Sequence, residues 1–139
     1  MKAAIEILTV LCTTTEYGTD KITERYQGAV TQTDEGLELI YQESDKVEAC
    51  LLIAEHSVNL WRKGQVKSHM EFMVNHQTLH PYLTPEGAFD MGVLTKTMSS
   101  DIKTDSGKLE LHYEILISGQ KMAENHLKVM WKKSDPELN

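Results

Sequence analysis

The chain has 139 residues, of which 40% are hydrophobic and 25% are charged, and these fractions are typical of one soluble globular domain. Its formal charge of −7, from 21 acidic and 14 basic residues, repels nucleic-acid phosphates, and the basic residues are scattered. We therefore expect no nucleic-acid binding. No apolar run approaches the roughly 18 residues of a membrane span, so we expect no membrane insertion either.

The N-terminal residues look only briefly like an export signal. Glu6 interrupts the apolar run, and Leu11 before Cys12 is too bulky for a signal-cleavage site. We interpret this segment as the buried first strand of a cytoplasmic protein. Cys12 and Cys50 fit a reducing compartment as two inert thiols, although a disulfide stays open because the sequence does not show their separation.

Alternation of apolar and polar residues is the dominant pattern along the chain. Apolar residues recur at every second position in nine runs, which lie within 5–12, 22–30, 37–43, 47–53, 58–62, 70–74, 89–95, 109–117 and 127–131. This pattern is typical of antiparallel strands with one buried face. No segment shows sustained helical spacing, and Gly18 weakens the one short helical turn that residues 13–21 could form.

Residues that favour turns separate several of these runs. They are Asp34-Glu35-Gly36, Lys63-Gly64, Pro85-Glu86-Gly87, Asp105-Ser106-Gly107 and Ser118-Gly119. Eight to ten strands joined by short turns predict an all-β fold, a single antiparallel up-and-down β-barrel, because closure removes exposed strand edges. A β-sandwich stays open, since alternation alone does not separate the two. We expect one domain over 1–133 and a polar tail over 134–139.

Several short motifs occur in an order and spacing similar to those of a known family. They are Tyr26-Gln27-Gly28, Ile40-Tyr41-Gln42-Glu43, Arg62-Lys63-Gly64, Met70-Glu71-Phe72, the segment 82–87, Thr95 and the run around Tyr113. Over nearly its whole length the chain resembles the YwiB-like family of uncharacterised small bacterial proteins. The resemblance implies a lipocalin-like (calycin-type) β-barrel but supplies no activity. Glu86 departs from the pattern, which has an apolar or aromatic residue before the glycine.

Arg62 is the residue that most needs an explanation. It shares the parity of Val58 and Leu60, so the alternation places its guanidinium on the apolar face of a strand. A buried arginine requires an anion. Glu24 and Glu43 also fall on inner-facing positions, and we favour an ion pair within the chain. A slip in parity near the following turn would instead place Arg62 in solvent.

The functional interpretation of Arg62 is an anchor for an anionic ligand in the barrel or at its mouth, because a planar guanidinium matches a carboxylate. The candidate ligand-binding residues are Arg62, the possible hydrogen-bond donors Tyr41, Tyr82 and Tyr113, the carboxylates Glu24 and Glu43, and the apolar residues Met70, Phe72 and Met91. For the methionines we favour core filling over a pocket, since a small barrel has room for at most a small ligand.

Motifs for catalysis and metal binding are absent from the sequence. There is no Gly-x-Ser-x-Gly turn and no phosphate-binding glycine loop, and nothing supplies a substrate pocket for Glu24 and Glu43 as a catalytic carboxylate pair. His76 and His80 are four residues apart, but Pro81 argues against the helix on which they would converge. We therefore expect no metal, no cofactor and a non-enzymatic function.

Two functions stay open. The first is binding of a small, partly apolar, anionic ligand through Arg62. The second is a protein-interaction or self-associating module with a filled barrel, and homo-oligomers belong to this alternative. A cluster in space of four apolar residues on the parity opposite to the core would support such an interface. They are Leu52, Trp61, Leu94 and Leu116.

Overall fold

Ten β-strands follow one another in the computed structural model, which describes residues 2–134 apart from the side chains of Tyr82 and Thr84. They are β1 (Lys2–Thr15), β2 (Gly18–Thr33), β3 (Gly36–Ser44), β4 (Val47–Ile53), β5 (Val58–Gly64), β6 (Lys67–Phe72), β7 (Gln77–Thr84), β8 (Gly87–Ile102), β9 (Ser106–Ile117) and β10 (Gln120–Lys133). Residues 13–21 form the β1–β2 hairpin and not a helical turn. None of the described residues belongs to a helix that could cross a membrane.

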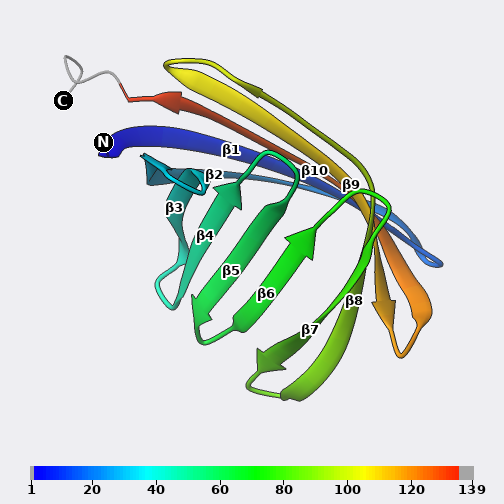
Figure 1. Ribbon diagram of the computed structural model, residues 1–139. Helices are drawn as coiled ribbons and strands as arrows, with labels where there is room; N and C mark the ends of the chain where they lie inside the picture. The colour runs from blue at the N-terminus through cyan, green and yellow to red at the C-terminus, as the bar shows by residue number, and fades with distance from the viewer. Residues whose placement is uncertain (1, 135–139) are drawn as a thin grey trace.

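The strands form a closed antiparallel barrel. Each strand pairs with the next, and β1 also pairs with β10, so the sheet closes in the order β1-β10-β9-β8-β7-β6-β5-β4-β3-β2 (Figure 1). This confirms the predicted up-and-down barrel over the sandwich. Of the tail predicted over 134–139, only Ser134 lies within the described residues.

The strands differ in length, and this difference opens the barrel on one side. β1, β2, β8, β9 and β10 are long, and Figure 1 shows them as a curved sheet that runs past the shorter β3 to β6. β2 pairs with β3 only through residues 28–33, so its first half, 18–27, pairs with β1 alone. Inner-facing side chains of that half therefore lie at an open end of the barrel.

The core consists of the inner-facing residues of nearly every strand. Its fully buried members include Ile5, Ile7, Leu39, Leu51, Phe72, Val93, Leu109, Leu111 and Val129. Gly28 also faces inward, where a Cβ would lie 2.6 Å from the Ile40 carbonyl oxygen and 2.9 Å from Ile7 Cδ1. Glycine at this position allows β2 and β3 to approach closely around the core.

β7 is the strand that the hydropathy pattern misses. It contains Pro81, and it shares only two register pairs with β6. Where this backbone ladder stops, the Thr78 hydroxyl donates to the Glu71 carbonyl at 2.7 Å, and the Glu71 N–H donates to His80 Nε2 at 3.2 Å. Side chains of β7 thus complete the hydrogen bonds between β6 and β7 that the backbone of β7 does not make.

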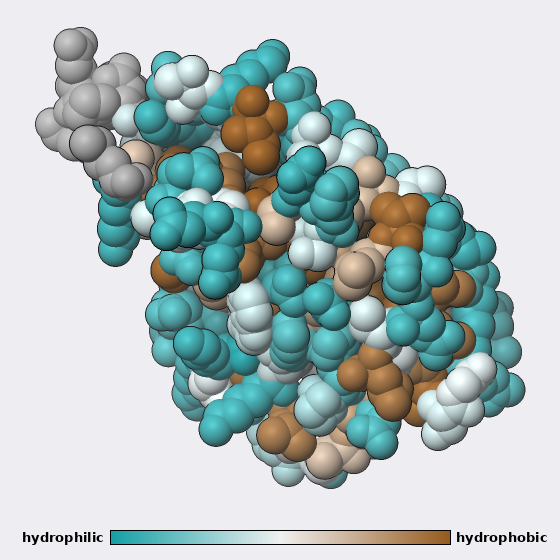
Figure 2. All heavy atoms as spheres, viewed as in Figure 1, coloured by the Kyte–Doolittle hydropathy of each residue, from teal (hydrophilic) through white to brown (hydrophobic). Residues whose placement is uncertain are grey.

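The outer surface is mostly hydrophilic. In Figure 2 hydrophobic atoms form small separate groups among polar ones on the face that is visible. The largest exposed apolar fractions belong to Tyr17, at 91%, and Leu79, at 66%. The visible face therefore shows no single broad hydrophobic area.

Candidate functional site

Arg62 lies on the inner face of the barrel near the β5–β6 turn. It is in register with Ala49 on β4 and Ser68 on β6, and it follows Leu60, which is 2% exposed. Gly64 begins the turn with a φ of 116°, a conformation that favours glycine. The structure thus places Arg62 on the face that the alternation predicts, with its side chain 26% exposed.

The anion that Arg62 requires comes from the same chain. Arg62 Nε donates to Glu43 Oε1 at 2.6 Å, and Nη2 donates to Glu43 Oε2 at 3.5 Å. Burial lowers the pKa of Arg62, but the charge and hydrogen bond of Glu43 outweigh burial, so the net shift of the pKa is upward. The guanidinium therefore stays charged, and it carries N–H donors beyond the two that Glu43 accepts.

Two of the predicted tyrosines lie at the same end of the interior. Tyr41 and Tyr113 are 6% and 3% exposed. Burial raises the pKa of both phenols, and the hydrogen bond of Asn125 to Tyr113 and the charge of Arg62 offset only part of this shift. Both hydroxyl groups therefore remain neutral donors at physiological pH. The side chain of Tyr82, the third predicted donor, lies outside the described part of the structure.

Glu24 does not join Arg62 and Glu43. It faces Thr9 in the β1–β2 register, and it is exposed on the half of β2 that has no β3 partner. The pKa of Tyr26 is raised first by burial and then by the charges of Glu43 and Glu24. Glu24 is thus a residue of the open end, and its predicted place as a second buried carboxylate beside Arg62 is wrong.

Three buried polar atoms line the interior without a hydrogen-bond partner among the described residues. They are Ser68 Oγ, Thr95 Oγ1 and Asn125 Oδ1. Ser68 is the register partner of Arg62, and Thr95 and Asn125 lie on either side of Tyr113 across β8, β9 and β10. Buried polar groups nearly always bind protein, water or ligand. These atoms therefore offer hydrogen bonds that the described chain does not use.

The sequence analysis does not propose Ser68, Thr95 or Asn125 as site residues, because a hydroxyl or an amide gives neither a hydropathy signal nor a charge. Parity nevertheless places all three on the inner face. Thr95 ends the alternating run 89–95, Ser68 lies two residues before Met70, and Asn125 lies two residues before Leu127. The alternation that places Arg62 inside the barrel therefore also places these three residues there.

The predicted apolar lining lies in the core and not at the open end. Met70, Phe72 and Met91 are 7%, 0% and 9% exposed, so they fill the interior. By contrast, Phe89 shares the parity of Met91 and is 48% exposed, and Ile22 shares the inner parity of β2 and is 52% exposed. Ile22 and Phe89 are thus exposed apolar side chains on inner-facing positions, and the register relates Phe89 to Arg62 through Tyr82 and Ser68.

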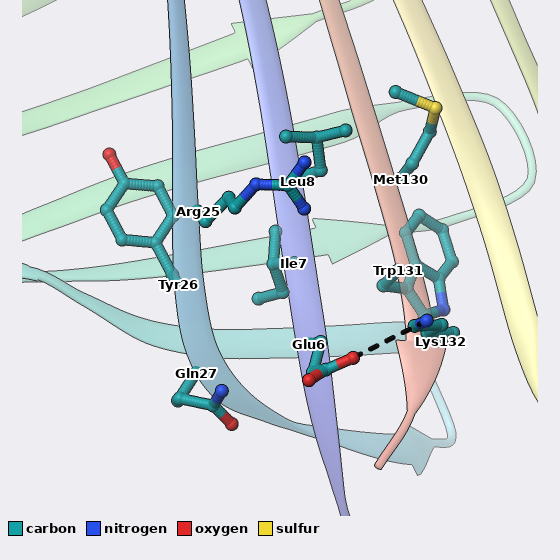
Figure 3. A pocket seen from close by; sticks show the side chains of 9 residues that line it. All are labelled: Glu6, Ile7, Leu8, Arg25, Tyr26, Gln27, Met130, Trp131 and Lys132. Carbon is teal, nitrogen blue, oxygen red and sulfur yellow. Dashed lines mark ion pairs between the residues drawn. The ribbon is translucent and has the colours of Figure 1, made fainter.

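Two hollows among the described residues lie away from Arg62. One, of about 420 Å³, lies on the outer face of β2, β1 and β10 (Figure 3). The other, of about 250 Å³, lies beside Trp131 and the β8–β9 turn. Arg62 lines neither, so the site around it is defined by its contacts and not by these hollows.

The surroundings of the histidines and cysteines indicate structural roles. The His69 ring stacks on Trp61 with centroids 4.8 Å apart, and burial, followed by the neighbouring His80, lowers the pKa of His69. Cys12 and Cys50 are free thiols. Within residues 2–134, no three histidine, cysteine, aspartate or glutamate side chains come together as a metal site.

The four outer-face residues predicted to form one interface lie in two places. The register puts Leu52 diagonal to Trp61 on β4 and β5, and Leu94 diagonal to Leu116 on β8 and β9. All four are half-buried. They do not form a single cluster of the kind that would support the interaction hypothesis.

Comparisons with known proteins agree with the barrel. The chain matches the DUF1934 family, described as a domain of unknown function, over residues 5–129. It is 26% identical over 82 residues to the uncharacterised β-barrel protein YwiB of Bacillus subtilis (strain 168), and this alignment spans 58% of each protein. The crystal structure of the ywiB protein from Bacillus subtilis matches with a TM-score of 0.87 at 18% identity, over 96% of this chain and 94% of that chain.

These matches confirm the resemblance that the sequence motifs indicate, and they bring no activity with them. At 18% identity the structural match shows the shared fold alone. The chain belongs to the DUF1934 family, and it has the β-barrel fold of the ywiB protein.

Proposed function

We propose that this protein binds a small, partly apolar anion at the open end of its barrel and is not an enzyme. The observation that carries the proposal is a half-buried arginine beside unused polar groups. Glu43 holds Arg62 in one orientation, which lowers the entropy lost when the remaining N–H groups bind a ligand. Tyr41 and Tyr113 would donate further hydrogen bonds to the anionic group.

The surroundings of Arg62 support a ligand with both polar and apolar parts. Ser68 Oγ and Thr95 Oγ1 are buried and lack partners among the described residues, so a polar head group or its bound water would satisfy them. Phe89 remains about half exposed on an inner-facing position, and the register relates it to Arg62 through Tyr82 and Ser68. An apolar body contacting Phe89 would remove hydrophobic surface from water.

The neutral charge of the Arg62–Glu43 pair limits which anions would bind. Because Glu43 cancels most of the long-range attraction of Arg62, affinity depends on directional hydrogen bonds more than on net charge. A sulfonate or carboxylate on an apolar skeleton has both oxygen acceptors for directional hydrogen bonds and an apolar body. A small, strongly hydrated anion such as chloride has neither.

Fluorescence titration with 1-anilinonaphthalene-8-sulfonate, an apolar ring system with one sulfonate, tests this proposal. The double variant Arg62→Leu/Glu43→Leu removes both charges without leaving either one unpaired. We expect the variant to stay folded and to bind the sulfonate probe roughly tenfold more weakly, the loss of about one charged hydrogen bond. Undiminished binding by the folded variant would reject the proposal.

Two controls separate the site from nonspecific binding. N-phenyl-1-naphthylamine has the same rings without the sulfonate, so its affinity should be equal for the native chain and the double variant. Lys67→Leu removes a cation from an exposed position of β6, away from both hollows, and it should leave binding of the sulfonate probe unchanged. Equal losses in Lys67→Leu and the double variant would show a general effect of positive charge and contradict a site at Arg62.

A further inference from the structure

An apolar row runs along the outer face of β1. Leu8, Val10 and Cys12 are half-buried there, on the parity opposite to the core. In the register of the sheet, Leu8 lies between Arg25 of β2 and Met130 of β10. Figure 3 shows Arg25 extending from β2 over β1 toward Leu8. The row is therefore flanked by side chains from both neighbouring strands.

Cationic side chains flank this row on both sides. Lys21 and Arg25 lie on β2, and Lys128 and Lys132 lie on β10, opposite outward positions of β1. The outward-facing residues of β1 between positions 6 and 12, together with their register partners on β2 and β10, include one carboxylate, that of Glu6. Glu6 forms an ion pair with Lys132 at 3.6 Å. Within residues 2–134, Lys21, Arg25 and Lys128 take part in no ion pair. This face is thus positive in a chain whose net charge is −7.

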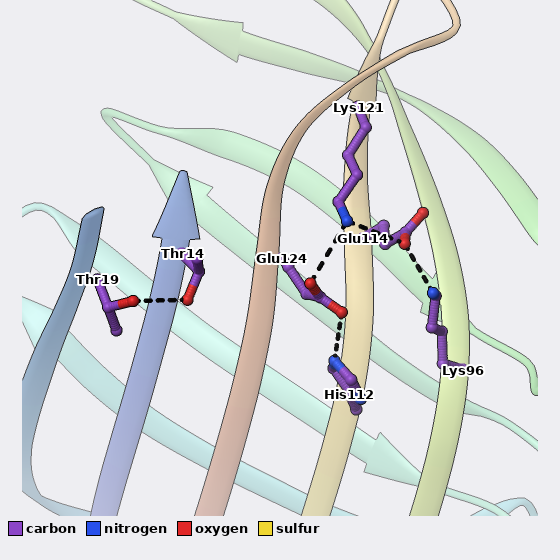
Figure 4. A network of polar contacts seen from close by, with 7 residues as sticks. All are labelled: Thr14, Thr19, Lys96, His112, Glu114, Lys121 and Glu124. Carbon is purple, nitrogen blue, oxygen red and sulfur yellow. Dashed lines mark hydrogen bonds and ion pairs between the residues drawn. The ribbon is translucent and has the colours of Figure 1, made fainter. Parts of the chain in front are cut away.

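On the neighbouring outer face, the charged side chains form ion pairs with one another. On β8, β9 and β10, Lys96 pairs with Glu114 at 2.8 Å, and Lys121 bridges Glu114 and Glu124 at 3.3 and 3.4 Å (Figure 4). His112 Nε2 lies 2.9 Å from Glu124 Oε1. The charges on this neighbouring face are therefore paired across strands, whereas Lys21, Arg25 and Lys128 beside β1 are not.

The shape and lining of the hollow on this face limit the kinds of partner that could bind there. It measures about 420 Å³, and its lining includes Leu8, Arg25, Met130 and Lys132. A flat lipid surface does not reach a recessed apolar floor, and the net charge of the chain repels anionic membranes and nucleic acids. A protruding protein segment with acidic and apolar side chains matches both the shape and the charge.

We propose that the outer face of β2, β1 and β10 binds an acidic amphipathic helix of a partner protein. β1 pairs on both sides with neighbouring strands, so a partner cannot add a strand to it, whereas a helix can lie in the groove with its apolar stripe on the row. The cations on β2 and β10 are two strand spacings apart, about 10 Å. That width is close to the diameter of a helix, about 10–12 Å.

The length of the row sets the length of the bound segment. The backbone from Glu6 to Cys12 spans about 20 Å at the rise of an antiparallel strand. A helix of about 13 residues covers the same length. Its apolar stripe would contact Leu8, Val10 and Met130, and carboxylates on both flanks would meet the cations.

Nuclear magnetic resonance of the full chain tests this surface with a synthetic helical peptide, leucine on one face and glutamate on both flanks. We expect amide shifts at Leu8, Val10, Arg25 and Met130, and a dissociation constant that rises with salt. Arg25→Glu should weaken binding roughly tenfold or more. Lys67→Glu makes the same charge change at an exposed position of β6 and should leave the affinity unchanged.

Three outcomes would overturn the proposal. They are shifts that avoid β1, β2 and β10, equal losses of affinity in Arg25→Glu and Lys67→Glu, and equal binding of a control peptide with lysine in place of glutamate. Vesicles of phosphatidylserine provide a further arm of the test. If they bind in an Arg25-dependent way while the acidic peptide does not, the face recognises membranes and the proposed helix is wrong.

Discussion

The two ends of the barrel interior are filled in different ways. Around the start of β1, Ile5, Leu39 and Leu51 are at most 1% exposed and make an apolar core. Toward the end of β5, Arg62 and Glu43 form an ion pair whose side chains are 26% and 22% exposed. Apolar packing stabilises a fold without the desolvation penalty that a half-buried ion pair carries. The first end thus mainly stabilises the barrel, and the polar second end is the one at which we propose that a ligand binds.

The largest effect should come from shortening a core side chain. Phe72 is fully buried, and its ring meets that of Tyr113 with centroids 4.7 Å apart. Phe72→Ala should lower the free energy of unfolding by about 3–5 kcal/mol. Phe89→Ala makes the same change at the open end and should cost less than about 1 kcal/mol. Urea denaturation measures both, and similar losses would contradict the distinction between the two regions.

Breaking the ion pair should have the next largest effect. Arg62→Leu leaves Glu43 half-buried without its cation, and we expect a loss of about 2 kcal/mol, between the values for exposed and buried pairs. Arg62→Leu/Glu43→Leu should recover most of this loss. If chemical denaturation finds the single variant as stable as the native chain, the pair contributes nothing and Arg62 is not held by Glu43.

The side-chain hydrogen bonds between β6 and β7 can be tested separately from these two regions. His80→Ala leaves the Glu71 N–H without its acceptor, and we expect a loss of about 1–2 kcal/mol. His76 is exposed, so His76→Ala is the matched control and should change stability by less than about 0.5 kcal/mol. Thermal unfolding followed by circular dichroism compares them. Equal melting temperatures would show that the hydrogen bond from the Glu71 N–H to His80 contributes nothing to stability.

His69 should give stability a modest pH dependence. Burial and then His80 lower its pKa below 6.5 in the folded chain, so the unfolded chain binds a proton more readily. Its contribution is therefore fully present above about pH 6.5 and is lost as the pH falls through the lower pKa of the folded state. Urea midpoints at pH 7.5 and 5.5 should fall less for His69→Gln than for the native chain. An unchanged difference would assign the slope to other groups.

The smallest effect on stability is expected at Thr95. Its hydroxyl is fully buried without a partner among the described residues, so Thr95→Val should be neutral or slightly stabilising. If a ligand uses this hydroxyl, the same variant should bind the sulfonate probe more weakly. A clear loss of stability would instead show that Thr95 has a hydrogen bond within the folded chain, for example through a buried water.

The sequence predicts most of the fold because the barrel depends on local alternation. Nine of the ten strands carry an apolar period of two, and glycine lies in or beside six of the nine turns. β7 lacks this signal, since Thr78 and His80 stand at alternate positions and Pro81 interrupts the strand. Its hydrogen bonds to β6 come from side chains, which no hydropathy pattern reports.

The site is predictable only in part, because parity gives the face of a residue but not its level in the barrel. Parity places Arg62 and Glu43 inside, and it gives the same result for Glu24. Which carboxylate reaches Arg62 depends on how far β2 extends past β3, and this follows from the closed sheet as a whole. The unpartnered hydroxyl of Thr95 likewise becomes visible only when neighbouring strands are in place.

Amide chemical shifts of the native chain during titration with 1-anilinonaphthalene-8-sulfonate show directly where this anion binds. Binding beside Arg62 predicts saturable shifts at Tyr41, Arg62, Ser68 and Tyr113, at the open end of the barrel. Shifts confined to Leu8, Arg25 and Met130 on the outer face, or no saturable shift at all, would contradict it.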